Sequence, residues 1–478
     1  MKLDEGQIRS IVDKVVLRLV KEEKEELLPK NTCVVEEPIG IFPDINSAIS
    51  AACESQKKLA SLPLEKREEI ILSIRNSGIK NSEHLAKLAV EETGLGRCED
   101  KIKKNLLVSN LTPGIEDLKP IAFSGDHGLT ITERAPYGVI GSITPVTNPS
   151  ETIINNSIGM IAGGNSVVFN PHPKAKKVSL KTIDFLNREI VENGGPENLL
   201  TTLEDPTIST AQELMNHPGI DLLVVTGGQD VVREAKKSGK KVIAAGPGNP
   251  PVVVDETADI EKAGKDIVDG ASLDNNIVCT DEKEVFVVDK VFDELKESMK
   301  KNGAFELNQH QGKRLKRLIL EEDKGPNTPS IINRKFVGKD AKEYLKALDI
   351  DYKGEVRLLI METEKDHPFV RTELLMPILP IVRARDVDEA IGMAIKAESG
   401  RGHTASMFSK NIEKLSKMAR LINTSIFVKN GPSYAGLGLG GEGYTSFTIA
   451  TGTGEGLTTA KTFTRERRCT LVDYFRIV

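Results

Sequence analysis

Cys279 is the side chain in this sequence whose type and position are best suited to chemistry. It follows residues 259–267, where apolar side chains recur at helical spacing, and it precedes 284–288, an apolar run typical of a buried strand. A short connection between two packed elements can hold a side chain rigidly and still leave it exposed. Cys279 is therefore a candidate reactive thiol. The alternative is a small buried hydrophobic residue, which is the usual role of a single cysteine.

Three other segments have residue types that could contact a ligand. Residues 226–228, Thr-Gly-Gly, follow a predicted strand and open a helix, where the backbone can approach an anion such as a pyrophosphate; an ordinary strand-to-helix turn explains the same pattern. Residues 143–149 end another predicted strand with polar side chains that could reach a ligand. Asn148 before Pro149 is equally typical of a helix N-cap. Residues 436–441 match G-x-G-x-x-G, but the helix that this fingerprint requires does not follow, so we expect a loop.

Composition excludes several classes of protein. The 478 residues are 39% hydrophobic and 28% charged, as in an ordinary globular protein with several domains. The net charge of −5 gives no electrostatic footprint for nucleic acid or an anionic membrane. No apolar run approaches membrane-spanning length, and the N-terminus lacks a secretory signal. The five dispersed cysteines disfavour a disulfide framework or a zinc site and suit a reducing cytosol.

The chain is organised as helices, then two α/β patterns. Residues 40–118 have helical periodicity and 121–137 are extended. Five apolar strands then alternate with helices between 139 and 243, which predicts a parallel sheet covered on both faces. A second α/β pattern, which contains Cys279, runs from about 250 to 445, and the tail after 461 is extended. The fold class is therefore α/β.

The first twenty residues differ from the rest. Apolar side chains between 8 and 20 recur at helical spacing, and the strongly charged run 21–26 follows them. An amphipathic helix on a solvated tether is the natural interpretation, and its apolar face must dock on something. Packing on its own protein, or fraying, explains this segment equally well.

Taken together, these segments resemble the aldehyde dehydrogenase superfamily. The chain is most similar to the CoA-acylating aldehyde dehydrogenases of the ethanolamine- and propanediol-utilisation microcompartments. The similarity spans about 35–478 and is carried by motifs in the expected order: 92–94 (Glu-Thr-Gly), 112–114 (Thr-Pro-Gly), 143–149, 171–173 (Pro-His-Pro), 225–228, 248–250 (Gly-Asn-Pro), 274–276 (Asp-Asn-Asn) with Cys279, 372–374 (Thr-Glu-Leu) and 424–430.

The resemblance implies two parallel-sheet α/β domains and an extended oligomerisation arm. The expected parts are an amphipathic targeting helix (1–20), a charged linker (21–34), an NAD-binding domain (35–118 and 138–246), a catalytic domain (247–445) and the arm (119–137 and 446–478). The arm implies a homodimer or homotetramer. The helix implies docking on a microcompartment shell protein through residues 1–20, and hence a place in the lumen of a cytoplasmic bacterial microcompartment.

The resemblance also implies a role for each matching residue. Cys279 falls at the nucleophile, and Asn148 or its neighbour Thr147 falls near the oxyanion contact, with the choice left open. Glu373 falls where the superfamily acid binds the nicotinamide ribose, and Asn170 replaces a ribose-binding lysine of many members. The implied NAD contacts are Ile143, Thr144, Pro145, Asn170, His172, Thr226, Gly227, Gly228, Ala245, Gly246 and Glu373, with no metal.

One departure from the superfamily pattern points to the acyl acceptor. Hydrolytic members have a glutamate that activates water where this chain has Ala244. A thioester on Cys279 would lack that base, whereas the CoA thiol needs less help to attack it. The implied reaction oxidises acetaldehyde or propionaldehyde with NAD⁺ and CoA to acyl-CoA and NADH, through a cysteine thiohemiacetal and thioester. The alternatives are a hydrolytic aldehyde dehydrogenase that releases free acid and a non-catalytic microcompartment cargo protein.

Overall fold

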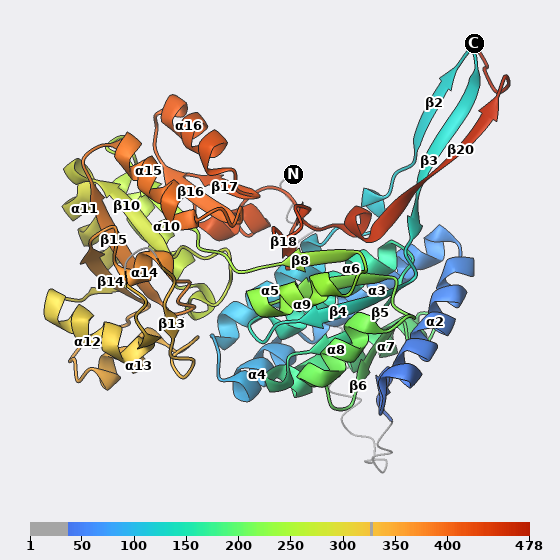
Figure 1. Ribbon diagram of the computed structural model, residues 1–478, viewed down its shortest axis with the longest axis horizontal. Coiled ribbons are helices and arrows are strands. Elements are labelled where there is room, and N and C mark those ends of the chain that lie inside the picture. The colour runs from blue at the N-terminus through green and yellow to red at the C-terminus, as the bar shows by residue number, and fades with distance from the viewer. Residues whose placement is uncertain (1–36, 326–327) are drawn as a thin grey trace, which may run out of the picture. The chain divides into compact units, whose positions relative to one another are not determined.

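Six parallel strands form the first sheet of the computed structural model, which describes residues 37–325 and 328–478 (Figure 1). Their spatial order is β1 (Ile41–Phe42), β6 (Leu200–Leu203), β5 (Ser166–Pro171), β4 (Val139–Thr144), β7 (Leu222–Thr226) and β8 (Val242–Ala245). The order of strand addition reverses between β4 and β7. In parallel sheets, ligands bind in the crevice outside the carboxyl ends of the strands at such a switch point.

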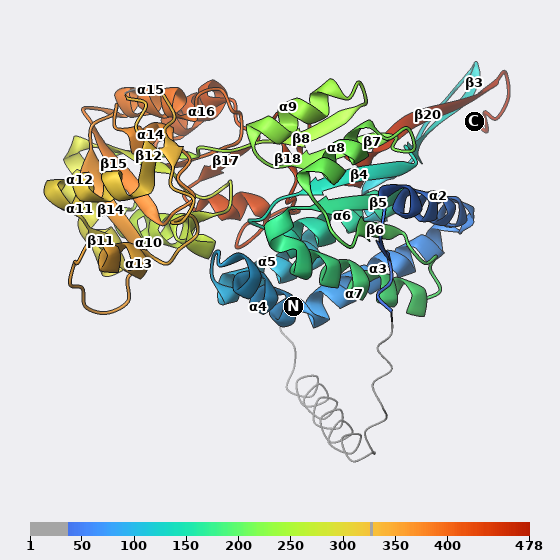
Figure 2. The ribbon, with the colours of Figure 1, turned by 60° about the horizontal axis from the view of Figure 1, so that its bottom comes forward.

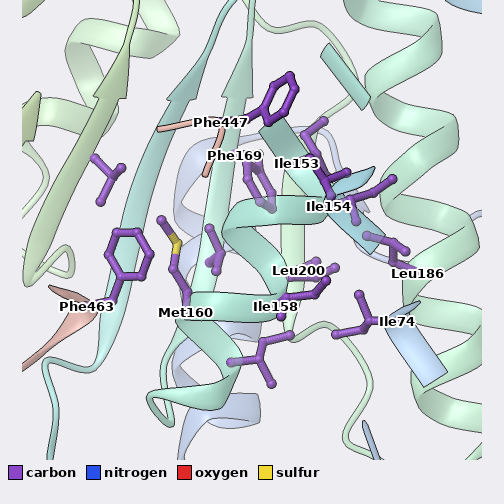
Figure 3. Close-up of a cluster of buried hydrophobic side chains, with 14 of the residues drawn as sticks. Ile74, Ile153, Ile154, Ile158, Met160, Phe169, Leu186, Leu200, Phe447 and Phe463 are labelled. Atoms are coloured by element: carbon purple, nitrogen blue, oxygen red, sulfur yellow. The ribbon is translucent and has the colours of Figure 1, made fainter. Parts of the chain in front are cut away.

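Helices cover both faces of this sheet, and Figure 2 shows α3 and α7 on one side and α8 and α9 on the other. The helices of this part are α2 (Ile45–Ser61), α3 (Leu64–Lys80), α4 (Ser82–Thr93), α5 (Cys98–Leu111), α6 (Pro149–Ala162), α7 (Lys176–Glu192), α8 (Ile208–Asn216) and α9 (Gln229–Lys237). Strand residues alternate between two cores: Ile140 packs with Ile153 and Phe169 in the cluster of Figure 3, whereas Val139 packs with Ile45 on the opposite face. Burial of both faces explains why these strands read as continuous apolar runs.

The predicted α/β class with parallel sheets is confirmed, and all five predicted strands are present in this sheet, which β1 extends to six. The additional strand, β1, pairs with β6 through Ile41 and Phe42. A strand of two residues is too short to give a period, so the sequence around it reads as the start of the helical region.

Seven parallel strands form the second sheet. Their order is β11 (Ala304–Glu306), β14 (Leu358–Thr363), β15 (Ile378–Ala384), β10 (Glu284–Val288), β9 (Pro251–Val254), β16 (Thr404–Phe408) and β17 (Ile426–Lys429). One core packs α10 (Ile260–Ala271) and α11 (Asp289–Lys301) on one face, and a second packs α15 (Val387–Glu398) and α16 (Ile412–Ile422) on the other. The remaining elements are α12 (Gln309–Ile319), α13 (Ala341–Ala347), α14 (Pro368–Arg371) and two short hairpins, β12 (Leu320–Glu322) with β13 (Ile331–Ile332) and β18 (Ile449–Ala450) with β19 (Gly456–Leu457).

Three antiparallel strands form an arm. They are β2 (Ile121–Gly125), β3 (Gly128–Pro136) and β20 (Thr464–Val472), in the order β2-β3-β20, and they lie side by side in Figure 1. Apolar side chains on this small sheet are exposed, among them Phe123 at 59% and Val472 at 59%. A three-stranded sheet with apolar side chains left uncovered is typical of a surface that meets another chain.

One compact unit, Ile39–Val478, contains both sheets and the arm. The predicted targeting helix (1–20) and charged linker (21–34) lie outside the described residues. Among the described helices, none has the length and apolar content needed to cross a bilayer.

Candidate active site

Cys279 lies on a tightly held loop between α10 and β10. Three consecutive residues of this loop have left-handed backbone conformations, with φ of 46° at Asp274, 58° at Asn275 and 64° at Asn276. Such a run is costly for non-glycine residues and needs support from its surroundings. Lys283 supplies part of that support, because its Nζ donates to the carbonyl oxygens of Asn276 (2.9 Å) and Val278 (3.1 Å). The predicted short, rigid connection is therefore present, and Cys279 is partly buried in it.

Loops that enter neighbouring strands of the second sheet surround Cys279. Gly248 precedes β9, and a Cβ there would lie 2.4 Å from the Cys279 carbonyl oxygen and 3.1 Å from Cγ of His403, which precedes β16. The Gly248 N–H donates to Glu373 Oε1 at 3.3 Å. The structure therefore brings together two of the predicted site residues, Glu373 and Cys279. It also places His403 close to them, a residue that the sequence did not single out.

Burial dominates the electrostatics of the cysteine. Burial, together with the nearby Glu373 carboxylate, raises the pKa of the Cys279 thiol to about 12, and Lys283 offsets this only in part. Burial likewise raises the pKa of Glu373. The resting residue at neutral pH is thus the thiol and not the thiolate, so a proton must leave Cys279 before it can act as a nucleophile.

The raised pKa predicts how alkylation of the free enzyme depends on pH. Because only the thiolate reacts, the rate at which iodoacetamide modifies Cys279 should rise about tenfold per pH unit between pH 7 and pH 10, without a plateau. Peptide mapping of the modified residue over this range measures the rate. A plateau below pH 8 would contradict the raised pKa.

His403 is a buried imidazole close to the Cys279 loop. Its side chain is buried (1% exposed), Nδ1 lies 2.9 Å from the Thr404 hydroxyl, and Nε2 has no hydrogen-bond partner among the described residues. Burial, reinforced by the cations Lys283 and Arg401, lowers the pKa of His403 to about 3, so the imidazole is neutral at pH 7 and is a weak proton acceptor in the free enzyme. In the sequence it is a single histidine before an apolar strand, and no spacing pattern singles it out.

All the predicted dinucleotide contacts except Glu373 lie at the carboxyl ends of strands of the first sheet. Thr144 ends β4, and its neighbour in register on β5 is Pro171; Thr226 ends β7 and is paired with Ala245 of β8. A Cβ on Gly228 or on Gly246 would meet nothing within 4 Å, so a ligand can approach the backbone there. The buried Thr144 hydroxyl has no hydrogen-bond partner in the part of the chain that the structure describes.

These observations fit a dinucleotide at this edge. Gly228 is the N-cap of α9, where unpaired N–H groups favour a pyrophosphate. The predicted contacts Ile143, Pro145, Thr226 and Gly227 lie at the same strand ends. The two remaining predicted contacts, Asn170 and His172, lie at the end of β5 and directly after it.

Asn170 has a structural function in addition to its place at this edge. Its Nδ2 donates to the Thr207 carbonyl at 3.3 Å, and its Oδ1 accepts from the Thr210 hydroxyl at 2.7 Å. These bonds tie β5 to the start of α8, where the Thr207 side chain caps the helix. A lysine at 170 could not replace them, because it has no acceptor.

Asn148 is at the predicted N-cap position of α6, but its side chain makes no capping hydrogen bond. Instead its Oδ1 accepts from Lys104 Nζ at 2.5 Å, and its Nδ2 donates to the Thr147 hydroxyl at 3.3 Å. Asn148 is buried, whereas Thr147 is partly exposed. Both residues follow β4, at the switch point of the first sheet.

Ala244 occupies a closed position in β8. It is fully buried, its N–H donates to the Thr453 hydroxyl at 2.9 Å, and its carbonyl accepts from the Gly452 N–H at 3.1 Å. A methyl group cannot activate water.

The G-x-G-x-x-G pattern at 436–441 lies in a loop, as expected. A short turn ends at Gly438, and no helix follows before Ile449.

The fold and these side chains define a class of enzyme in which a cysteine reacts beside a dinucleotide site. Among the described residues, no three His, Cys, Asp or Glu side chains are grouped so that they could hold a metal ion. The aldehyde dehydrogenase family model matches residues 30–312 and 356–461. The chain belongs to the aldehyde dehydrogenase family.

Three relatives show where the chain stands within that family. It is 50% identical over 479 residues to the acetylating acetaldehyde dehydrogenase EutE of Salmonella typhimurium, with 100% of each chain covered. It is 47% identical, with a TM-score of 0.89, to a propionaldehyde dehydrogenase from the fucose-utilisation bacterial microcompartment of Clostridium phytofermentans, covering 92% of this chain and 100% of that one. The Rhodopseudomonas palustris propionaldehyde dehydrogenase, solved with bound CoA and an acylated cysteine, is 48% identical with a TM-score of 0.88, covering 91% and 98%.

Proposed function

We propose that this chain is a CoA-acylating aldehyde dehydrogenase, which converts acetaldehyde or propionaldehyde, CoA and NAD⁺ to acyl-CoA and NADH. The observation that carries the proposal is the pairing of a tightly held Cys279 with an alanine at 244, where a hydrolytic enzyme of this family needs a carboxylate. The relatives named above are acetylating or propionaldehyde dehydrogenases, and one of them was solved with CoA.

The first half of the reaction forms a thioester on Cys279. The Cys279 thiol releases its proton to solvent as its sulfur bonds to the aldehyde carbon, which makes a thiohemiacetal. The Asn148 Nδ2–H and the Cys279 backbone N–H stabilise the oxyanion. NAD⁺, when bound at the carboxyl ends of the first sheet, supplies the acceptor for the hydride that leaves this carbon. The oxyanion then re-forms a carbonyl, and the acyl group remains on the sulfur.

The second half transfers the acyl group to CoA. The CoA sulfur attacks the thioester carbon, its proton leaves, and the Cys279 sulfur departs and recovers a proton. A thiol pKa lies near working pH, so CoA needs less activation than water does. Because the side chain at 244 is a methyl group, water lacks the base that would let it compete.

A kinetic comparison tests this proposal against a hydrolytic enzyme. We expect steady-state NADH formation from acetaldehyde to require CoA and to yield one acyl-CoA per NADH. Equal rates with and without CoA, with free acid as product, would establish the hydrolytic alternative. Absence of NADH formation under all conditions, with NAD⁺ and CoA present, would favour a non-catalytic cargo protein.

We further propose that the enzyme assembles through its arm into a homodimer or homotetramer. The exposed apolar side chains of the arm, such as Phe123 and Val472, support this assignment, since a second copy of the chain could cover them. Within residues 37–325 and 328–478, the long strand β20 pairs with β3 alone, which leaves its other edge open to a further strand. Sedimentation as a monomer at micromolar concentration would contradict the assignment.

Residues 1–20 are proposed to direct the enzyme into the lumen of a bacterial microcompartment by docking on a shell protein. Their amphipathic period and charged tether support this, as does the microcompartment origin of a 47% identical relative. Deleting residues 1–20 should leave kcat and KM unchanged and greatly reduce co-purification with shells. Shell association that survives the deletion would contradict targeting through this segment.

A further inference from the structure

Four buried ionisable side chains lie between α5, α6 and the cysteine loop. Lys101 and Lys104 come from α5, Glu151 from α6 and Asp274 from the loop, and each side chain is at most 1% exposed. Both ammonium groups contact Asp274 Oδ2, Lys101 at 2.9 Å and Lys104 at 2.6 Å. The formal charges sum to zero, so each buried charge has opposite charge close to it, as a buried ionic group requires.

Lys104 has the central position in this cluster. Its Nζ lies 3.0 Å from Glu151 Oε1 and donates to Asp274 Oδ2 and, at 2.5 Å, to Asn148 Oδ1. Burial alone would lower the pKa of Lys104, but Asp274 and Glu151 outweigh it and hold the pKa above its usual value. Lys104 is therefore a cation, and an ammonium group can only donate hydrogen bonds.

The ammonium group decides which way the Asn148 amide faces. Because Lys104 can only donate, the amide oxygen must point to it, and the NH₂ group must point away. One N–H of that group is used by the Thr147 hydroxyl at 3.3 Å. The other can donate to a further acceptor. A flipped amide would present a carbonyl oxygen, which would repel an oxyanion.

Asp274 connects the same ammonium group to the loop that carries Cys279. Its Oδ1 accepts from the Arg97 N–H at 2.6 Å, and its own backbone has the left-handed φ of 46° that begins the strained run. The next two residues hold the run in place: Asn275 Nδ2 donates to the Gly338 carbonyl at 3.0 Å, and Asn276 Nδ2 donates to the Ala271 carbonyl at 2.8 Å. One cation thus contacts both the Asn148 amide and the loop of the nucleophile.

We infer that Lys104 is a positioning residue for acyl transfer: its ammonium group holds the Asn148 amide with an N–H directed to the carbonyl oxygen of the substrate and anchors the Cys279 loop through Asp274. This inference rests on the proposed function, in which Asn148 contacts the oxyanion. Lys101 is a matched comparison, because it contacts Asp274 and the Thr147 carbonyl oxygen (3.1 Å) but not the Asn148 side chain.

A double-mutant cycle on the full-length enzyme tests the inference. Lys104→Met should lower kcat about 100-fold with little change in the KM for aldehyde, because a misplaced amide loses a transition-state hydrogen bond. In the Asn148→Ala background, the same substitution should lower kcat clearly less than about 100-fold, because only the anchoring of the Cys279 loop is then lost. Lys101→Met should lower kcat less than Lys104→Met, and its effect should multiply with that of Asn148→Ala.

Each other outcome has a distinct meaning. Multiplicative effects of Lys104→Met and Asn148→Ala, or equal losses of kcat for Lys104→Met and Lys101→Met, would overturn the inference while leaving the proposed function intact. If Asn148→Ala itself left kcat unchanged, both the oxyanion assignment and the inference would fail. Should Lys104→Met not fold, the pair Lys104→Met with Glu151→Gln removes one charge of each sign, and the same cycle with Asn148→Ala applies.

Discussion

Replacing Cys279 with alanine is expected to lower the rate of acyl-CoA formation by at least ~10⁴-fold, the loss typical of removing a nucleophile. The physical reason is that the methyl group cannot form the thioester from which CoA receives the acyl group. Dinucleotide binding should be retained, since the predicted contacts other than Glu373 lie at the carboxyl ends of the first sheet and none of them is on the cysteine loop. Fluorescence titration with NADH and a CoA-dependent rate assay measure the two properties.

Cys469 provides the control for that experiment. It is an exposed free cysteine on β20 of the arm. Cys469→Ala should leave the rate of acyl-CoA formation per subunit unchanged. A Cys279→Ala enzyme that still formed acyl-CoA at the normal rate would exclude covalent catalysis by this residue.

Replacing Asn148 with alanine is expected to lower kcat by about 10²- to 10³-fold, or ~3 kcal/mol of transition-state stabilisation. The KM for aldehyde should change little, because the lost hydrogen bond is made mainly in the transition state. Thr147→Val, which removes the hydroxyl next to it, should have the smaller effect, since that hydroxyl accepts the Asn148 N–H. Steady-state kinetics of the two variants decides which side chain contacts the oxyanion.

Asn148→Asp is the matched control, because it keeps an acceptor for Lys104 and the size of the side chain. It removes the N–H donor and places negative charge near the oxyanion, so kcat should fall at least as far as in Asn148→Ala. A larger loss in Thr147→Val than in both Asn148 variants would assign the contact to Thr147 instead.

Much of the fold could be predicted because local signals agree with burial on both faces of the sheets. Apolar runs such as 284–288 became central strands, and residues with helical spacing such as 45–60 became helices of the expected length. The roles of Cys279 as nucleophile and of Ala244 as the position of a missing base stay predictions, and they depend on the resemblance to a known family.

What the sequence could not predict depends on contacts between distant segments. His403 meets the Cys279 loop through Gly248, across more than a hundred residues of chain. Asn148 is typical of an N-cap in the sequence, but its side-chain oxygen accepts a hydrogen bond from Lys104, which lies 44 residues earlier. The thiol pKa is also a property of the folded site, because burial, not a neighbouring residue type, is its largest cause.

The central claim is that the acyl group rests on Cys279 until CoA removes it. The most direct measurement incubates the enzyme with acetaldehyde and NAD⁺ without CoA, counts the NADH formed and maps the modified peptide by mass spectrometry. The account predicts a single burst of NADH, one per active site, an acetyl group on the peptide that contains Cys279, and release of that group as acetyl-CoA when CoA is added. Continuous NADH formation with accumulation of acetate, and no acetyl group on Cys279, would contradict it.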